Sequence, residues 1–343
     1  MNKWKKTILG TGVIILILSL VVFYFPTWTP KIKTENGIST LEQVDINGSK
    51  HAIMIRGRNL DNPVILFVHG GPASSELPFA KKNQDLLESR FTVVNYDQRA
   101  SGKSYHFSED YSNLSADLLV EDLLAITDYI TERLGKKKVI LIGHSFGTYI
   151  GTLAAQKAPE KFEAYIGIGQ VGDVLLSETE SWSYVVEQAR LAGNEKDVQE
   201  LEQVAEAIQE GQAFTPRQYV KKYGGAARLM ENPDESFWGK ALSSEYNIVD
   251  TFRHTKGMSY SQEILIGEAM VNSLPSRVTE MDLPIYFVMG DYDYMTSSLA
   301  AKLFFEGIEA EQKEFISYEQ SAHYPHYEEK ERFLNWMVKE FIQ

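Results

Sequence analysis

A serine flanked by small residues is the strongest chemical signal in this sequence. Ser145 lies at the centre of Gly-His-Ser-Phe-Gly, residues 143–147, directly after the apolar run Val139–Ile142. Glycines at both ends leave room for a strained turn from a strand into a helix, and such a turn exposes the serine hydroxyl. The pattern therefore predicts a nucleophilic serine at the start of a helix, ready to attack a carbonyl carbon.

A serine nucleophile needs a base, and the chain has seven histidines from which to choose. His323 follows the last predicted strand, so it would lie on the same rim of a parallel sheet as Ser145. His326 is the alternative base. We do not expect the two histidines to bind a metal, because Pro325 interrupts a helical face and no third ligand is evident.

The base needs an orienting carboxylate, which we also expect after a strand. The apolar run Ile285–Met289 leads into Gly290-Asp291-Tyr292-Asp293. Asp293 is the first candidate and Asp291 the second, and a carboxylate that only stabilises a turn is the alternative for either. The resulting chain order, Ser145, Asp293, His323, is the order expected when the serine stands on a strand–turn–helix.

Backbone amides near the serine are expected to bind the oxyanion. The apolar run Val64–Val68 continues into His69-Gly70-Gly71-Pro72, where adjacent glycines let the backbone approach a substrate closely. We predict that the N–H groups of Gly71 and Phe146 are the two donors. The alternative is that the two glycines only form a tight turn.

Composition excludes several classes of function. The 343 residues carry a formal net charge of −13, which disfavours binding to nucleic acid. The chain has no cysteine, so disulfides, thiolate catalysis and cysteine zinc sites are excluded. No cofactor is expected, because Gly102-Lys103-Ser104 resembles the end of a phosphate loop but Asp97 stands where that loop needs a glycine.

Alternating strand and helix patterns are expected to hold these residues in place. Strands are predicted around a hairpin at 41–57 and at 64–68, 91–96, 139–142, 165–168, 285–289 and 315–318, and helices at 76–89, 115–134 and 328–341. The alternation stops after about residue 172 and gives way to polar helical patterns. We predict an α/β fold with a mostly parallel sheet, helices on both faces and an inserted helical cap, divided into core 41–172, cap 173–282 and core 283–343.

The N-terminus has the pattern of a membrane anchor. A basic stub at 1–6 precedes an uncharged run of 19 residues at 7–25, long enough to cross the ~30 Å hydrocarbon layer. The lysines of the stub are expected to stay cytoplasmic, which would place the rest of the chain outside the cell. Residues 26–40 are expected to form a polar linker. A cleaved signal peptide is the alternative, although no small-residue cleavage site is visible.

Three motifs together resemble the proline iminopeptidase branch of the α/β-hydrolase superfamily. Residues 69–73 look like its H-G-G-P-G, residues 97–104 are similar to its D-Q-R-G-x-G-x-S, and residues 143–147 match its G-x-S-x-G. The regions around Asp293 and His323 resemble the acid and base positions of the family. The resemblance implies an aminopeptidase with a Ser-His-Asp triad that removes an N-terminal residue, often proline, from short peptides.

The resemblance also implies cap glutamates that hold the free α-amine of the substrate. Glu178 is the first candidate, and the other glutamates considered are Glu180, Glu187, Glu231 and Glu245. Ala73 and Ala100 replace glycines of the family pattern, and we expect them to narrow the loops beside the serine. Two other functions stay open: an esterase or lipase with the same triad, and a non-catalytic extracellular binding module.

Overall fold

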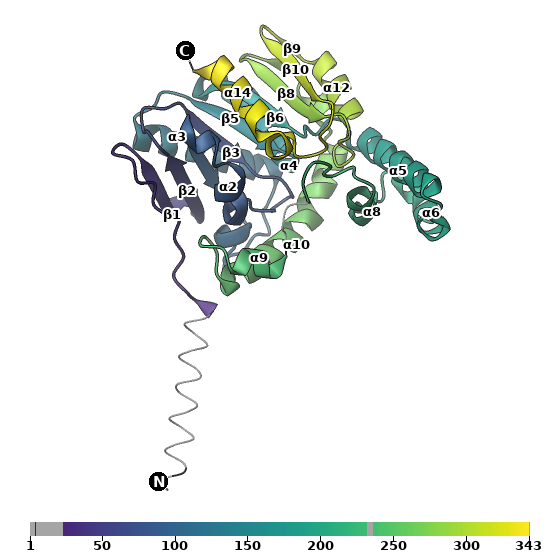
Figure 1. Ribbon diagram of the computed structural model, residues 1–343, viewed down its shortest axis with the longest axis horizontal. Helices are drawn as coiled ribbons and strands as arrows, with labels where there is room; N and C mark the ends of the chain where they lie inside the picture. Colours follow the sequence, from purple (N-terminus) through teal and green to yellow (C-terminus); the bar gives the residue numbers. More distant parts are fainter. Residues whose placement is uncertain (1–3, 5–22, 232–235, 343) are drawn as a thin grey trace.

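A mixed sheet organises the protein (Figure 1). The computed structural model describes residues 4, 23–231 and 236–342. Within these residues the main sheet has eight strands in the order β1-β2-β4-β3-β5-β6-β8-β10. Their bounds are β1 Ile38–Ile46, β2 Ser49–Gly57, β3 Val64–Val68, β4 Thr92–Tyr96, β5 Val139–His144, β6 Phe162–Ile168, β8 Ile285–Gly290 and β10 Lys313–Tyr318. From β4 to β10 the neighbouring strands run parallel, which confirms the predicted mostly parallel sheet.

The antiparallel edge of the sheet is the hairpin expected at 41–57. Strands β1 and β2 pair from Ile38 opposite Gly57 to Ile46 opposite Ser49. The two turn residues have positive φ, 48° at Asn47 and 76° at Gly48. Positive φ at both central positions is the geometry of a tight hairpin turn that matches strand twist, and Asn-Gly adopts it readily.

Both faces of the parallel strands are covered, as their continuous apolar runs indicate. In β3, Leu66 and Val68 pack with side chains of α3 and α4, whereas Ile65 and Phe67 pack with α14. Successive side chains of a strand point to opposite faces, so one five-residue strand contributes to two cores. Complete burial of such a side chain contributes roughly 1.5–3 kcal/mol.

The helices follow the predicted alternation, with shorter ends. The expected helix at 76–89 is the short α2, Leu77–Asn83, followed by a separate turn of 3₁₀ helix at Leu87–Ser89. The closing helix begins two residues later than expected, after the short helix α13. The helices of the core are α2, α3 Ala116–Leu134, α4 Phe146–Lys157, α12 Ser298–Gly307, α13 Pro325–Glu328 and α14 Lys330–Phe341.

A block of helices separates β6 from β8, where the insertion is expected. These helices are α5 Val174–Leu191, α6 Glu195–Glu202, α7 Ala205–Gln209, α8 Arg217–Lys222, α9 Phe237–Ala241, α10 Ile248–Val271 and α11 Leu274–Arg277. The longest described helix is α10, which begins with a reciprocal capping box between Asn247 and Asp250. Short strands β7 Glu280–Met281 and β9 Glu309–Ala310 pair separately from the main sheet. The exact limits of the cap at 173 and 282 stay a prediction.

The segment expected to be a linker, 26–40, is hydrogen-bonded to the rest of the protein. Its last residues begin β1, and Arg56 donates hydrogen bonds to the Thr29 hydroxyl at 2.6 Å and to the Pro30 carbonyl at 2.7 Å. Most of the predicted anchor, residues 7–22, lies outside the described residues. No helix in the described part of the chain combines the length and apolar character that a membrane span requires.

Candidate active site

Ser145 occupies the predicted sharp turn between β5 and α4. Its backbone is strained, with φ 53° and ψ −128°, and its N–H donates to the Ile168 carbonyl at 2.9 Å. The glycine two residues later is required by space, because a Cβ on Gly147 would lie 2.1 Å from the Val68 carbonyl oxygen. The turn therefore places Ser145 at the N-terminal end of α4, where the helix dipole is positive.

Asp293 and His323 are joined by a hydrogen bond behind this serine. Nδ1 of His323 lies 2.8 Å from Oδ2 of Asp293, and both side chains are buried. The Asp293 carboxylate also accepts from the backbone N–H groups of Met295 at 2.9 Å and Thr296 at 3.1 Å, and from the Thr296 hydroxyl at 3.0 Å. These bonds fix the carboxylate so that it orients the imidazole ring.

The second choices for base and acid lie elsewhere. His326 is buried against Tyr327 and Phe67, with ring centroids 3.8 Å and 5.7 Å away, and it does not line the cavity next to Ser145. Asp291 is exposed. The geometry thus brings together the first choices of the sequence analysis.

Burial governs the protonation of the pair. Burial lowers the pKa of His323, and the negative charge of Asp293 offsets part of that effect. Burial alone would raise the pKa of Asp293, but its interaction with His323 and its hydrogen bonds with Thr296 outweigh burial, so the pKa lies below the usual value. Near neutral pH the site therefore holds a carboxylate beside a neutral imidazole, which is the form of histidine that accepts a proton.

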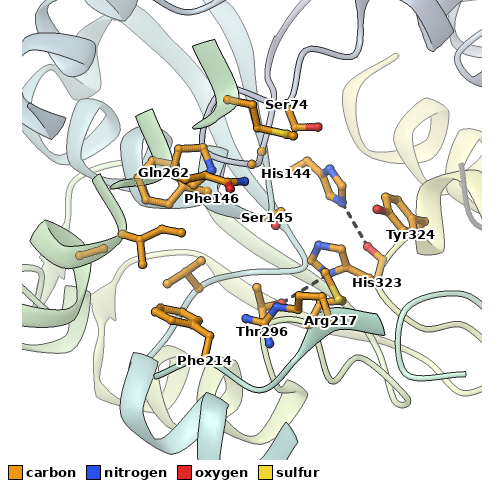
Figure 2. A pocket seen from close by; sticks show the side chains of 18 of the residues that line it. Ser74, His144, Ser145, Phe146, Phe214, Arg217, Gln262, Thr296, His323 and Tyr324 are labelled. Carbon is orange, nitrogen blue, oxygen red and sulfur yellow. Dashed lines mark hydrogen bonds between the residues drawn. The ribbon is translucent and has the colours of Figure 1, made fainter. Parts of the chain in front are cut away.

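Ser145 and His323 line one cavity of about 410 Å³ between the core and the cap (Figure 2). Within the described residues no hydrogen bond joins the Ser145 hydroxyl to His323. Glycines leave the space that both side chains occupy. A Cβ on Gly70 would lie 2.7 Å from Cβ of Ser145, and one on Gly169 would lie 2.8 Å from the ring of His323.

The predicted oxyanion donors border the same cavity. Gly71 and Phe146 both line it. In the described part of the chain, neither backbone N–H donates to another protein group. Both N–H groups can therefore donate to an oxygen atom bound near Ser145.

Glu178 lines the cavity, but its carboxylate already has partners. Oε1 accepts from Arg217 at 2.5 Å, and Oε2 accepts from Arg217 at 3.0 Å and from the Thr215 N–H at 2.8 Å. The expected amine anchor is thus paired with a guanidinium that also lines the cavity (Figure 2). The other candidates, Glu180, Glu187, Glu231 and Glu245, do not line it.

A second buried group beside the site was missed by sequence reasoning. Nδ1 of His144 lies 2.9 Å from Oε1 of Glu76, and Tyr327 donates to the other Glu76 oxygen at 2.5 Å. Glu76, His144 and His326 form the one group of three His, Asp or Glu residues in the described chain whose ligand atoms lie within 4.8 Å of one another. His144 and Glu76 are satisfied by their mutual hydrogen bond and by contacts with the His323 carbonyl and the Tyr327 hydroxyl. No pattern in the sequence marks Glu76 in advance.

The Asp-Gln-Arg motif has structural partners. Arg99 binds Asp122 with two hydrogen bonds of 2.7 and 2.9 Å, and the buried Lys103 ammonium pairs with Asp250 of α10. The motif thus ties the core to the cap. Ala73 and Ala100 have φ of 59° and 58°, the conformation that glycine favours, but neither lines the cavity, so the expected narrowing beside the serine is not seen there.

Comparison with known proteins agrees with this arrangement. A family model described as alpha/beta hydrolase fold matches residues 63–330. The chain belongs to the α/β-hydrolase family. This α/β hydrolase is 27% identical over 315 residues to "Probable aminopeptidase YbaC" of Bacillus subtilis (strain 168). The matched region covers 90% of the chain and 98% of the relative.

Two further proteins are similar to this α/β hydrolase over most of their length. It is 24% identical over 340 residues to a proline iminopeptidase of Saccharolobus solfataricus, covering 93% of the chain and 96% of the relative. The crystal structure of a proline iminopeptidase from Mycobacterium smegmatis superposes with a TM-score of 0.62 at 16% identity, covering 88% of this chain and 97% of that one. The protein is therefore a hydrolase that resembles the proline iminopeptidases.

Proposed function

We propose that this protein is a serine hydrolase in which Ser145, His323 and Asp293 act as a triad. The observation that carries the proposal is the 2.8 Å hydrogen bond between His323 and Asp293 in the wall of the cavity that Ser145 lines. The strained turn at Ser145 supports it, because such backbone strain gathers at functional sites.

The reaction follows from these positions. Oγ of Ser145 attacks the substrate carbonyl carbon while Nε2 of His323 takes the hydroxyl proton, and Asp293 stabilises the imidazolium that forms. The carbonyl oxygen becomes an oxyanion bound by the N–H groups of Gly71 and Phe146. The tetrahedral intermediate collapses, the leaving group departs with the proton from His323, and an acyl-enzyme remains. Water activated by His323 then adds to the acyl carbon and releases the acid and free Ser145.

The substrate class we favour is the N-terminal residue of a short peptide, with proline preferred. The relatives named aminopeptidase and proline iminopeptidase support this choice. In this reading the α-amine binds near Glu178, with Arg217 as part of the same wall. Amide hydrolysis then releases one amino acid and a shortened peptide.

Esters are a second candidate class, and the charge of the cavity favours them. The carboxylates in its described lining are Glu76 and Glu178, and each is paired with a basic side chain, His144 or Arg217. Much of the remaining wall is apolar, with Phe79, Phe146, Phe214, Met258 and Ile266 among its residues. Such a lining suits an acyl group without charge.

The proposal also includes attachment to the membrane, with the catalytic domain outside the cell. Its support is the 19-residue uncharged run at 7–25 that follows a basic stub. A short peptide or ester at the outer surface would then reach the site without crossing the membrane.

Substitution of the nucleophile tests the chemistry. Ser145→Ala should abolish hydrolysis of prolyl-naphthylamide and of short acyl esters, and it should abolish labelling by a fluorophosphonate probe. Ser108→Ala, at an exposed serine away from the cavity, is the matched control. Turnover retained by Ser145→Ala would refute the triad, and a folded wild-type protein that the probe never labels would favour the non-catalytic binding module. The ratio of naphthylamide to ester activity in the wild type separates the two substrate classes.

A further inference from the structure

Large apolar side chains gather at one end of the protein, around the short helix α9. Trp238 is 62% exposed and Leu242 is 79% exposed, so both present apolar surface to the solvent. We call this the α9 surface and define it by its exposed members Phe25, Trp28, Trp238, Leu242 and Phe252. Edge contacts of Phe237 with Trp238 and with Phe252, at centroid distances of 5.3 and 5.2 Å, join its cap members.

The α9 surface is continuous with the N-terminal segment. Nδ2 of Asn247 donates to the Phe25 carbonyl at 3.0 Å, and the Trp28 N–H donates to the Ser244 carbonyl at 2.9 Å. Residues 25–28 therefore lie against the connection between α9 and α10. Figure 1 shows α9 and the start of α10 at the end of the molecule where the N-terminal segment leaves the body.

Few acidic residues occur in the two segments that form the α9 surface. The chain has 47 acidic residues, yet residues 236–255 contain only two, Glu245 and Asp250, and both are buried. Asp250 is neutralised by Lys103 and Arg253. Residues 23–33 contain no acid, and their two charged residues, Lys31 and Lys33, are exposed. The two segments that form the α9 surface, 23–33 and 236–255, therefore expose no carboxylate.

We propose that the α9 surface rests in the interfacial layer of the lipid bilayer, beside the N-terminal anchor. The inference depends on the proposed membrane attachment and names a second contact with the same bilayer. The anchor, 7–25, ends at Phe25, which is itself part of the α9 surface, so a span across the membrane delivers this face to the lipid headgroups. Tryptophan and phenylalanine prefer that layer, and lysines beside them attract anionic headgroups.

Single-cysteine labelling provides the test, because the natural chain has no cysteine that would react. The full chain with Leu242→Cys carries an environment-sensitive NBD fluorophore and is reconstituted in phosphatidylcholine–phosphatidylglycerol vesicles. Leu303→Cys is the matched control, since Leu303 is 51% exposed on α12, at the opposite end of the molecule in Figure 1. Flotation of the vesicles on a density gradient reports attachment independently of the fluorophore.

If the α9 surface contacts lipid, emission from position 242 shifts to shorter wavelength and doxyl-labelled lipids reduce it about twofold or more, while position 303 stays unchanged. Protein that floats but shows no difference between the two positions overturns the inference and leaves the anchor in place. Protein that does not float overturns both. A probe at 242 that is shielded from aqueous iodide but not quenched by doxyl lipids also overturns the inference, because it shows that a protein partner or a second copy covers the face.

Discussion

Nε2 of His144 lies 3.2 Å from the backbone carbonyl oxygen of His323 (Figure 2). The residue before the serine thereby contacts the main chain of the proposed base. The other ring nitrogen, Nδ1, faces Glu76 at 2.9 Å. Each ring nitrogen of His144 therefore faces an oxygen acceptor, one from the Glu76 carboxylate and one from the main chain of His323. Burial would raise the pKa of Glu76, but the hydrogen bond and charge of His144 outweigh it and lower the pKa.

Glu76→Gln tests whether this link positions His323. Without the carboxylate, the His144 ring loses one of the two contacts that orient it, and its contact with the His323 carbonyl weakens. We expect kcat/KM to fall about 10–100-fold, because small displacements of a catalytic group are costly. The acid limb of the pH–rate profile should move as well, a change that a purely structural defect would not produce.

Tyr327→Phe is the control for that variant. It removes the 2.5 Å hydrogen bond to Glu76 but leaves the contact between Glu76 and His144. Its effect on kcat/KM should be less than about tenfold. An equal loss in the two variants would argue against a specific role for the link between His144 and His323.

The pH–rate profile itself depends on His323, which acts as a base only when neutral. Burial lowers the pKa of His323 below 6.5, so activity should persist as the pH falls to 6.5 and decline only at lower pH. Asp293→Asn removes the carboxylate that orients the ring and should lower kcat about 10³–10⁴-fold. Stopped-flow or steady-state rates between pH 4 and 8, roughly the range in which histidine titrates, measure both effects. An acid limb centred above 6.5 would contradict the expected direction.

Gly70→Ala should block the nucleophile. Its new Cβ would lie 2.7 Å from Cβ of Ser145, 2.9 Å from the His144 carbonyl oxygen and 3.3 Å from the Ser145 hydroxyl oxygen. We expect a loss of about 100-fold or more in turnover, since the serine must move away from its reactive position. Gly267→Ala on α10 is the matched control, because a Cβ there meets nothing within 4 Å. Circular dichroism melting curves of both variants show whether the fold survives.

The pairing of Glu178 with Arg217 predicts that a double variant is more stable than the single variant that removes only the cation. Arg217→Met leaves a buried carboxylate without its cation and should reduce the free energy of unfolding by about 2–4 kcal/mol, whereas Glu178→Gln with Arg217→Met should recover part of it. Denaturant titration measures both. If Glu178 also binds the substrate amine, Glu178→Gln should raise KM for prolyl-naphthylamide but not for acyl esters.

Acid sensitivity of the fold should come partly from His254, at the junction of α10 and the core. Its burial lowers the pKa to about 3, and its Nε2 has no hydrogen-bond partner among the described residues. In the unfolded chain the pKa is near 6.5, so the unfolded state binds the proton first as the pH falls. His254 therefore does not reduce the free energy of unfolding above pH 6.5. Below pH 6.5 that free energy falls progressively, until the pH reaches about 3. His254→Phe should flatten this decline in denaturant titrations, and an unchanged slope would contradict the assignment.

The sequence was sufficient for those parts of the site that local patterns specify. Residues 143–147 predicted the turn at Ser145 because glycine spacing and an apolar strand are local properties. Asp293 and His323 lie within hydrogen-bond distance of each other because both follow parallel strands, whose carboxyl ends share an edge of the sheet. Asn47-Gly48 marked its hairpin for the same kind of reason.

Contacts between segments far apart in the chain could not be predicted from the sequence. Glu76 and His144 are 68 positions apart, and Glu178 and Arg217 are 39 apart, so no periodicity links them. The partner of Glu178 changes its chemistry from a free amine anchor to half of an ion pair. The same limit applies to residues 26–40. Their polar composition suggested a linker, but hydrogen bonds with Arg56 and Ser244 hold them against the rest of the protein.

The attachment of that segment restricts how the enzyme can be oriented. Thr27 binds Lys103 of the core, and Trp28 binds Ser244 of the cap. Because the segment is held at two places, it restricts the rotation of the catalytic domain that a random coil of similar length would allow. If the chain is anchored at 7–25, the opening of the cavity keeps a constant orientation relative to the bilayer. Substrates then enter the cavity from one direction.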